Sequence, residues 1–443
     1  MKKLCYIVAL VLGFLLVVPS YAQDYARLGE RTIMGTARYV GMSGAMSAIG
    51  GDPSAVHDNP AGLGLYRRTE VLVTFEEDID KTWQVGVDNT TNKRFLPMCP
   101  QASLVWSAPR YKDDEQGVLF NNFMFTYRRL QSYGRTMYGT AANSTSLGSI
   151  LPTLDIPFCA DATSAVQTLL LKERGYVNEY AFNWAMNISN QWYVGAGFQI
   201  QSYLLSADAT YEEQFNTWNT EGNRYFNKNT TTVLYSGTSC SLSAGLIYRP
   251  VRWLRFGLGL QTYSLGSLYT GTTGTLTAQT DSLRNSYAPD QGFREASVST
   301  MPLHFSFSTA FQIGAYGLIS LQYDLFHQYK AAPMHSLRAG IEVIPVLGLY
   351  INAGYACESE FRRADRVVPM DATFDRQDTY YQFPKMAHYA SVAVGYRGTY
   401  MIVQAAYQYR LQRLNLYAHE AANPYDMHAD THRIVLTIGW HRH

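Results

Sequence analysis

Apolar and polar residues alternate in segments that recur from residue 69 to the end of the chain. The clearest segment is 179–188, whose alternate positions are Tyr180, Phe182, Trp184, Met186 and Ile188. An extended chain points successive side chains to opposite faces, so period-two alternation predicts a β-strand. The chain therefore reads as all-β from residue 69 onward.

We count fourteen such segments, and the connections between them alternate in length. They lie at about 69–77, 101–108, 120–130, 177–188, 191–206, 236–249, 252–264, 302–313, 316–327, 334–344, 347–357, 386–397, 399–411 and 431–440. Connections after even-numbered segments are short, and those after odd-numbered segments are mostly long. An even strand number with alternating short turns and long loops is typical of outer-membrane barrels. The pattern predicts a transmembrane antiparallel β-barrel of 14 strands, with its short turns in the periplasm.

A different kind of segment precedes the first strand. Residues 35–66 are rich in glycine and alanine, and Asp52-Pro53 and Asn59-Pro60 each read as an N-cap followed by proline at the first helical position. A barrel larger than about eight strands leaves a lumen that its own side chains do not fill. We expect residues 23–68 to form a small hatch (plug) of short helices inside a barrel of residues 69–443.

The first 22 residues have the layout of a secretory signal. Lys2 and Lys3 precede an apolar run from Leu4 to Val18, and Ser20-Tyr21-Ala22 resembles a cleavage site. The run of about 15 residues is short for a membrane-spanning helix, which needs about 20. We therefore expect residues 1–22 to be a signal peptide and the protein to reside in the outer membrane of a Gram-negative bacterium.

Composition agrees with a membrane barrel. The chain contains 34 tyrosines, and aromatic residues make up 14% of it, which suits aromatic girdles at two membrane surfaces. The formal net charge of +1 argues against a nucleic-acid partner, which requires a basic stripe. The cysteines form no C-x-x-C pair, and a disulfide between Cys99 and Cys159 is the pairing we expect.

The sequence Asp58 to Gly62 (DNPAG), placed in a hatch before fourteen strands, resembles the FadL-type outer-membrane transporters of hydrophobic compounds. The resemblance implies a lumenal pocket closed by the hatch, with sideways release through a wall opening beside a kinked third strand. Asn59, Pro60 and Ala61 would border that opening. The third strand, however, has neither glycine nor proline over 121–129.

The resemblance implies passive uptake of a hydrophobic small molecule, either long-chain fatty acid-like or aromatic. The same superfamily includes a shuttle protein that receives cargo from a secretion system, so a non-enzymatic docking barrel is the alternative function. For the carrier we expect surrounding outer-membrane lipids and a monomer, with no cofactor and no enzymatic activity.

Apolar hatch residues are the candidate ligand contacts. Methionine is flexible and polarizable, which suits a pocket for varied apolar ligands. The candidates are Met42, Met46, Ile49 and Leu63, together with Asn59, Pro60 and Ala61. The alternative is that these residues only pack the hatch against the barrel.

In the second long loop, residues 160–173 carry Val166, Leu169 and Leu170 at helical spacing. We expect an outer helix, which would either offer an apolar landing surface for ligand or fold onto the barrel rim. The lumen-facing positions carry charges of both signs, which either form a structural network or include an arginine that binds a carboxylate.

Two weaker chemical possibilities remain. His304-x-Ser306 places a base and a nucleophile on one strand face, as in a lipid hydrolase, but both point toward the lumen and no third residue is evident. In the last loop, His428, Asp430 and His432 would share one side of an extended segment and are a weak candidate for metal or haem contact.

Overall fold

The computed structural model describes residues 26–29, 31–87, 94–110, 116–142, 164–218, 224–279, 284–287, 292–298, 301–328, 333–359, 381–418 and 423–442. The expected signal peptide and Cys159 lie outside these residues. Within the described part of the chain, four short helices precede the strands: η1 (Ala26–Gly29), α2 (Ala37–Gly41), α3 (Pro53–Asp58) and η2 (Pro60–Leu65). Among the described residues, no helix is both long and apolar enough to span a bilayer.

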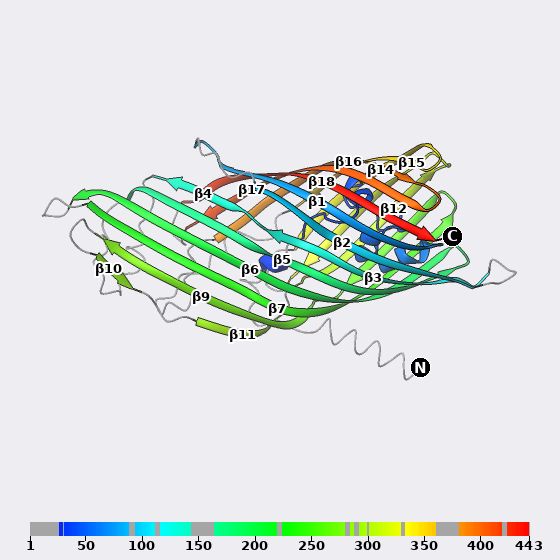
Figure 1. Cartoon of the computed structure of the whole chain (residues 1–443), viewed down its shortest axis with the longest axis horizontal. Coiled ribbons are helices and arrows are strands. Elements are labelled where there is room, and N and C mark those ends of the chain that lie inside the picture. Colours follow the sequence, from blue (N-terminus) through cyan, green and yellow to red (C-terminus); the bar gives the residue numbers. More distant parts are fainter. Residues whose placement is uncertain are drawn as a thin grey trace.

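Strands form one antiparallel sheet that closes where β1 pairs with β18 (Figure 1). The strands are β1 (Thr69–Gln84), β2 (Arg94–Pro109), β3 (Val118–Tyr133), β4 (Thr136–Ala141), β5 (Ser164–Ile188), β6 (Trp192–Trp218), β7 (Arg224–Val251), β8 (Leu254–Gln261), β9 (Leu265–Gln279), β10 (Arg284–Tyr287), β11 (Gly292–Val298), β12 (Leu303–Ile313), β13 (Gly317–His327), β14 (Met334–Val346), β15 (Leu349–Glu358), β16 (Tyr381–Arg397), β17 (Met401–Tyr417) and β18 (Tyr425–Arg442).

Several of these strands are pieces of one barrel strand. β3 and β4 both pair with β5, while β8 and β9 both pair with β7. β10 and β11 pair with β9, and β12 pairs with β8, so these three also form one strand. The result is the predicted closed barrel of 14 strands.

The strands extend far beyond the predicted limits at the end with the long connections. The expected helix over 160–173 is wrong, because β5 already runs from Ser164. In this outer half, Leu169 and Leu171 point inward and are fully buried, whereas Thr168 and Lys172 point outward. In this part of β5 the apolar residues point inward, whereas on a lipid-facing strand they point outward. A prediction that relies on outward apolar positions therefore ends the strand too early.

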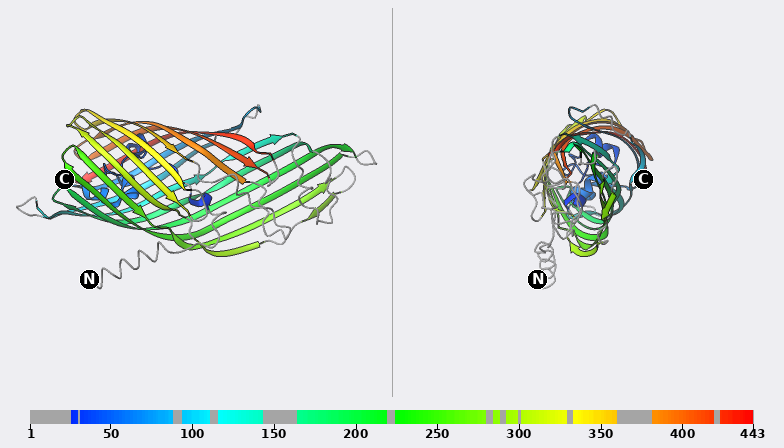
Figure 2. Two further views of the ribbon diagram at one scale, coloured as in Figure 1. Left: turned by 180° about the vertical axis from the view of Figure 1, so that it is seen from behind. Right: turned by 90° about the vertical axis from the view of Figure 1, so that its left-hand side faces the viewer.

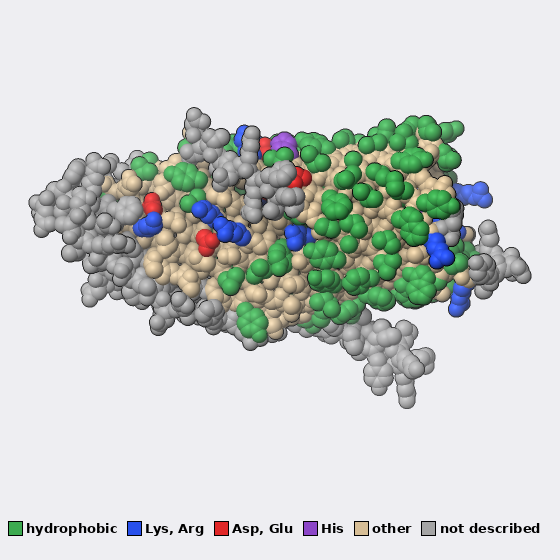
Figure 3. Space-filling model, viewed as in Figure 1, with side chains coloured by type: hydrophobic (Ala, Val, Ile, Leu, Met, Phe, Trp, Pro, Cys, Tyr) green, Lys and Arg blue, Asp and Glu red, His purple; other side chains and the backbone are tan. Residues whose placement is uncertain are grey.

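The hatch lies inside the barrel at the end with the short turns, while η1 lies further along the lumen (Figures 1 and 2). At this short-turn end, Ser189 and Asn190 have φ of 53° and 55°, the left-handed pair of a tight hairpin turn. Hydrophobic side chains gather over the half of the outer surface nearest these turns (Figure 3).

One ladder of the wall is incomplete. β2 pairs with β3 only from Gln101, opposite Arg128, to Pro109, although both strands continue toward the outer end. Pro97 and Pro100 lie on β2 in this stretch, and proline has no N–H to donate to a ladder. β3 also has a register shift against β5 between Arg129 and Gln131. The β2–β3 ladder therefore ends where proline occurs in β2, and the wall opening that the resemblance implies stays a prediction.

Candidate functional site

Side-chain caps shape the hatch, as the sequence predicts. Asp52 accepts a hydrogen bond from Ser54 N at 2.9 Å, and its carboxylate also receives the Thr36 hydroxyl. Asn59 caps η2 by accepting from Ala61 N at 3.1 Å, while its amide donates to the Ser47 carbonyl. These bonds fold residues 35–66 into short turns that need no long helix.

Glycines of the wall allow the hatch backbone to approach closely. A Cβ at Gly245 would lie 2.0 Å from Asn59 Oδ1, and one at Gly354 would lie 2.4 Å from the Met42 carbonyl carbon. Gly195 faces Pro60 in the same way, at 2.5 Å. Glycine supplies the space that any other residue would fill.

The predicted hatch contacts are packed against this wall. Met42, Met46 and Ile49 form one buried cluster with Ala310, Ala356, Ala387 and Tyr389. Ala61 packs on Tyr193 and Ile247. Leu63 packs on Val105, Met124 and Ala185. Pro60 and Asn59 are buried against the wall glycines Gly195 and Gly245, respectively. The structure thus distributes these seven residues over several patches of the wall, and their role in ligand binding stays a prediction.

Buried ion pairs fasten the hatch from two sides. Arg38 of α2 donates two hydrogen bonds to Glu342 of β14, at 2.7 and 2.8 Å. Burial would lower the pKa of Arg38, but the Glu342 carboxylate outweighs burial and raises it. On the other side, Arg433 donates to the Ile33 carbonyl at 2.7 Å and also binds Asp78. These contacts agree with the interpretation that the lumenal charges form a structural network.

A second network is centred on Asp58 in α3. Its carboxylate accepts from the Tyr39 hydroxyl at 2.7 Å and lies 3.4 Å from Arg338, which also contacts Asp324. Burial would raise the pKa of Asp58, but Arg338 and other cations outweigh it and hold the pKa at about 2. Asp58 is therefore ionised at neutral pH.

His57, the next residue, is held between opposite charges. Its Nδ1 lies 2.7 Å from Glu179, and its Nε2 lies 3.1 Å from an Arg31 nitrogen. Arg31 has no acceptor capacity, so it donates to Nε2 and the ring is the neutral Nδ1–H tautomer. Burial lowers the pKa of His57, with Arg128 and Arg31 acting in the same sense.

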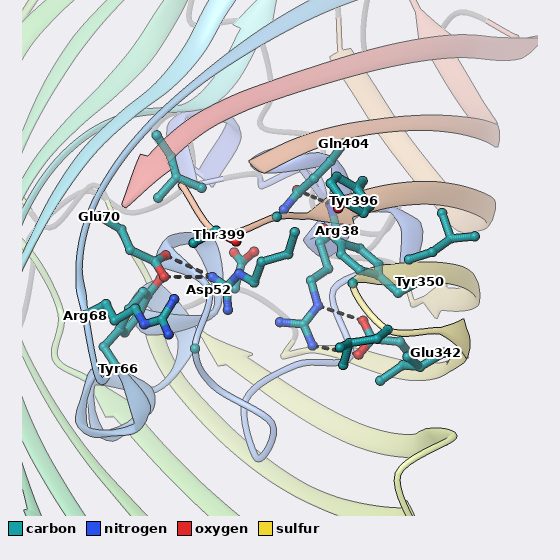
Figure 4. A pocket seen from close by; sticks show the side chains of 18 of the residues that line it. Arg38, Asp52, Tyr66, Arg68, Glu70, Glu342, Tyr350, Tyr396, Thr399 and Gln404 are labelled. Atoms are coloured by element: carbon teal, nitrogen blue, oxygen red, sulfur yellow. Dashed lines mark hydrogen bonds and ion pairs between the residues drawn. The ribbon is translucent and has the colours of Figure 1, made fainter. Parts of the chain in front are cut away.

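A cavity of about 580 Å³ opens at the short-turn end between hatch and wall (Figure 4). Arg38 and Glu342 pair on one side of it, and Arg397 pairs with Glu70 on the other at 2.9 Å. Asp52 also lines it. Because its lining carries six charged residues, the cavity suits water better than an apolar ligand.

The middle of the lumen is apolar, which sequence reasoning missed. Leu28 of η1 is fully buried there in a cluster we call the middle cluster. Its members are Leu28, Leu130, Tyr133, Val177, Tyr203, Leu205, Val233, Tyr235, Leu268 and Met301. Inward residues of the successive wall strands β3, β5, β6, β7 and β9 pack with one leucine from a four-residue 3-10 helix.

A further apolar cluster, the outer cluster, lies toward the long connections. It joins inward residues of β4, β5 and β6 to those of β17 and β18: Met137, Leu169, Leu171, Ala207, Ala209, Tyr211, Leu414, Leu416, Ala418, Tyr425, Met427 and Ala429. Of the residues predicted for the outer helix, Leu169 belongs to this cluster, Leu170 is half-buried and Val166 is exposed.

Side-chain hydrogen bonds also join β1 to β4 in this region. The Gln84 amide both donates to the Thr140 carbonyl and accepts from Thr140 N, each at 2.7 Å. Thr82 donates to the Thr136 carbonyl at 2.9 Å. β1 therefore meets β4 directly at the outer end, although β2 lies between β1 and β3 in the sheet.

A narrow basic cavity of about 30 Å³ adjoins the hatch on its outer side. Arg31, Lys385 and Arg410 line it, with Glu358 as the one acidic residue. Nε of Arg31 and of Arg410 is buried without a hydrogen-bond partner. Arg31 also reaches the Met301 sulfur of the middle cluster at 3.9 Å, so the basic cavity and the apolar cluster are adjacent.

The predicted serine–histidine pair is not assembled for catalysis. His304 Nε2 lies 2.9 Å from Asp324, whereas the Ser306 hydroxyl donates to the Asp58 carbonyl at 3.2 Å. Both residues are buried against the hatch. They contribute to the contact between hatch and wall.

His428, Asp430 and His432 share the outward face of β18, as alternation requires, but each has another partner. His428 packs on Trp83, Asp430 accepts from Tyr409, and His432 contacts the Tyr407 hydroxyl. Within the described part of the chain, no group of three ligands is arranged to hold a metal. Cys99 is a free, exposed thiol.

The closed 14-strand barrel with an N-terminal hatch is the fold of FadL-type transporters. The structure is similar to a Pseudomonas aeruginosa FadL homologue, with a TM-score of 0.55 and 12% identity over 93% of this chain and 99% of that one. The Pseudomonas putida toluene transporter TodX gives a TM-score of 0.56 and 12% identity at the same coverage. The Ralstonia pickettii toluene transporter TbuX gives 0.53 and 14%, again at 93% and 99%.

Comparison with protein-family models and with curated proteins gave no match. The likeness therefore lies in the fold, at low sequence identity.

Proposed function

We propose that this protein is an outer-membrane carrier for passive uptake of hydrophobic small molecules into a Gram-negative cell. The middle cluster carries the proposal: it is an apolar site inside the barrel, completed by Leu28 of a short turn. An apolar ligand that displaces Leu28 exchanges one buried apolar group for another at little cost. The fold shared with two toluene transporters supports the proposal.

The ligand we favour is an amphipathic acid. Its chain would occupy the middle cluster, and its carboxylate would lie at Arg31 and Arg410, whose Nε groups lack acceptors. Arginine binds carboxylates through paired, charge-assisted hydrogen bonds. A neutral aromatic compound would leave these donors unsatisfied.

The route we favour is sideways, through the stretch where β2 and β3 do not pair. Leu130 and Tyr133 belong to the middle cluster and lie two and five residues beyond Arg128, where the ladder ends. A ligand leaving the cluster would thus reach the membrane without crossing the packed hatch. The proposed transport route involves no catalytic step.

Mass spectrometry of lipophilic material extracted from the purified protein tests this function. We expect a stoichiometric organic acid that is absent from an unrelated barrel purified in the same detergent. Arg31→Gln and Arg410→Gln should each reduce its occupancy about tenfold, while Arg413→Gln, on the exposed face of β17, should not. Equal occupancy in all three variants, or bulk phospholipid alone after exchange into a lipid-free detergent, would contradict the proposal.

A further inference from the structure

Three neighbouring hairpins carry the same pair of side chains on the outer surface of the barrel. In each, a tyrosine hydroxyl of the first strand contacts Nδ1 of a histidine of the second. The pairs are Tyr323 with His335 at 2.7 Å, Tyr355 with His388 at 2.7 Å, and Tyr407 with His432 at 2.8 Å. They belong to β13–β14, β15–β16 and β17–β18.

The register of the pairs is also the same. Each histidine lies opposite the residue two positions after its tyrosine: Leu325 faces His335, Cys357 faces His388, and Tyr409 faces His432. From one hairpin to the next the pair shifts by two residues along the ladder, which is one residue per strand. A shift of one residue per strand is the stagger of barrels whose strands tilt by about 36°. The three histidines therefore lie at one height around the wall.

This height is an edge of the apolar surface. Eight residues after each histidine, the same strands carry Val343, Tyr396 and Trp440, and the outward positions between are alanine, valine, leucine or isoleucine. Eight residues of strand span about 27 Å, or about 20 Å along the barrel axis at this tilt, close to the apolar band of about 25 Å in such barrels. Beyond His432, β18 presents Asp430 and Asp426 outward.

Each ring leaves one nitrogen free for the surroundings. The tyrosine hydroxyl occupies Nδ1, and the described residues supply no partner for Nε2 of any of the three. A phenol that donates to Nδ1 fixes the tautomer with a hydrogen on Nε2, which is then a donor without a partner among the described residues. At the edge of the apolar band, the acceptors within reach are lipid headgroups.

We propose that His335, His388 and His432 form a row of binding sites for the phosphate groups of outer-leaflet lipids. The inference rests on the membrane location proposed above, but not on the transported ligand. Strands lie about 4.8 Å apart, so sites on every second strand are about 10 Å apart and each holds its own headgroup. The row would fix how deeply this side of the barrel lies in the membrane.

Native mass spectrometry of the full-length protein in detergent tests the proposal. The probes are phosphatidic acid and diacylglycerol with the same acyl chains, which differ only in the phosphate. We expect the wild type to retain phosphatidic acid at least fivefold better than diacylglycerol. The triple variant His335→Leu/His388→Leu/His432→Leu should lose this preference, and His428→Leu, whose ring packs on Trp83 further from the band, should keep it.

Equal retention of the two probes by the wild type, or an unchanged preference in the triple variant, would overturn the proposal. Should the triple variant not fold, the single variants decide it, since each should bind one phosphatidic acid fewer. Occupancy by the extracted acid, measured on the same samples, should be unchanged. Failure of the row is therefore distinguishable from failure of the proposed transport function.

Discussion

At the residue scale, the hatch is held by charges that are buried and paired. Such pairs add little stability over apolar packing, but breaking one leaves an uncompensated buried charge, which costs about 3–5 kcal/mol. Arg38 and Glu342 form the pair with the best geometry, because two hydrogen bonds join a planar guanidinium to a carboxylate.

Arg38→Met should therefore loosen the hatch. We expect α2 to lose about 3 kcal/mol of protection against local opening, because Glu342 is left buried without a cation. Amide hydrogen exchange in residues 37–41 would measure this change. Arg67→Met is the control, since Arg67 is exposed and its bond to Asn190 lies at the surface. Equal protection in the two variants would show that the ion pair does not hold α2.

His57 gives the hatch a predicted pH dependence. Its pKa in the folded protein is below the ordinary value of 6.5, so the unfolded chain binds the additional proton as pH falls. The stability that neutral His57 contributes is present above about pH 6.5 and is lost as pH decreases below it. Asp58, with a pKa of about 2, stays ionised throughout this window.

We therefore expect exchange protection of α3 to fall between pH 7.5 and pH 5. His57→Gln keeps hydrogen-bonding capacity but does not titrate here, so its α3 should respond much less to pH. A steeper response in the glutamine variant than in the wild type would refute the role of His57. Rates must be corrected for the intrinsic pH dependence of exchange.

At the element scale, glycines on wall strands determine how closely the hatch can dock. Gly354→Val should displace the hatch, because the new side chain would overlap the Met42 backbone. Unlike a flexible side chain, the backbone cannot move aside by changing rotamer. We expect a cost of 1–3 kcal/mol, the usual range for overpacking. Leakage of a small hydrophilic dye through reconstituted vesicles would report the displacement.

Ala353→Val is the matched control, because Ala353 directly precedes Gly354 on β15 and points outward. It should leave leakage unchanged. If both variants leaked equally, the effect would come from the strand itself and not from docking of the hatch.

At the scale of the whole molecule, the outer cluster joins β4, β5 and β6 to β17 and β18, which lie on either side of β1 and β2 in the wall. A ligand entering from the long-connection end must separate β4 from β18, which the outer cluster joins. A Cβ at Gly139 would lie 3.2 Å from the Tyr425 Cβ, near the spacing of about 3.5–4.5 Å found in disulfides.

Gly139→Cys/Tyr425→Cys should therefore form a disulfide between β4 and β18. We expect oxidation to reduce uptake at least tenfold and reductant to restore it, because the bond prevents these strands from separating. The single variants, each with one of the two cysteines, control for the lost tyrosine and for the native thiols. Full uptake by the oxidised double variant would show that the ligand enters elsewhere.

Much of the architecture was predictable because it depends on local pattern. Lipid on one face and hatch or water on the other impose the period of two, so the strands and their number follow from the residues. The caps at Asp52 and Asn59 also act within a few residues, and they mark the start of α3 and η2.

The site depended on contacts that no local pattern records. Leu28 shares one buried cluster with Leu268 and Met301, and Leu169 shares another with Leu416, only because the folded wall brings distant parts of the chain together. In its outer half the barrel is polar outward and apolar inward. The inward apolar residues of β5 therefore resemble one face of a helix in the sequence, although the segment is a strand. The strands and the hatch can be predicted from the residues alone, because they follow from local pattern and local caps. The apolar interior emerges only on folding, because it is built from residues hundreds of positions apart.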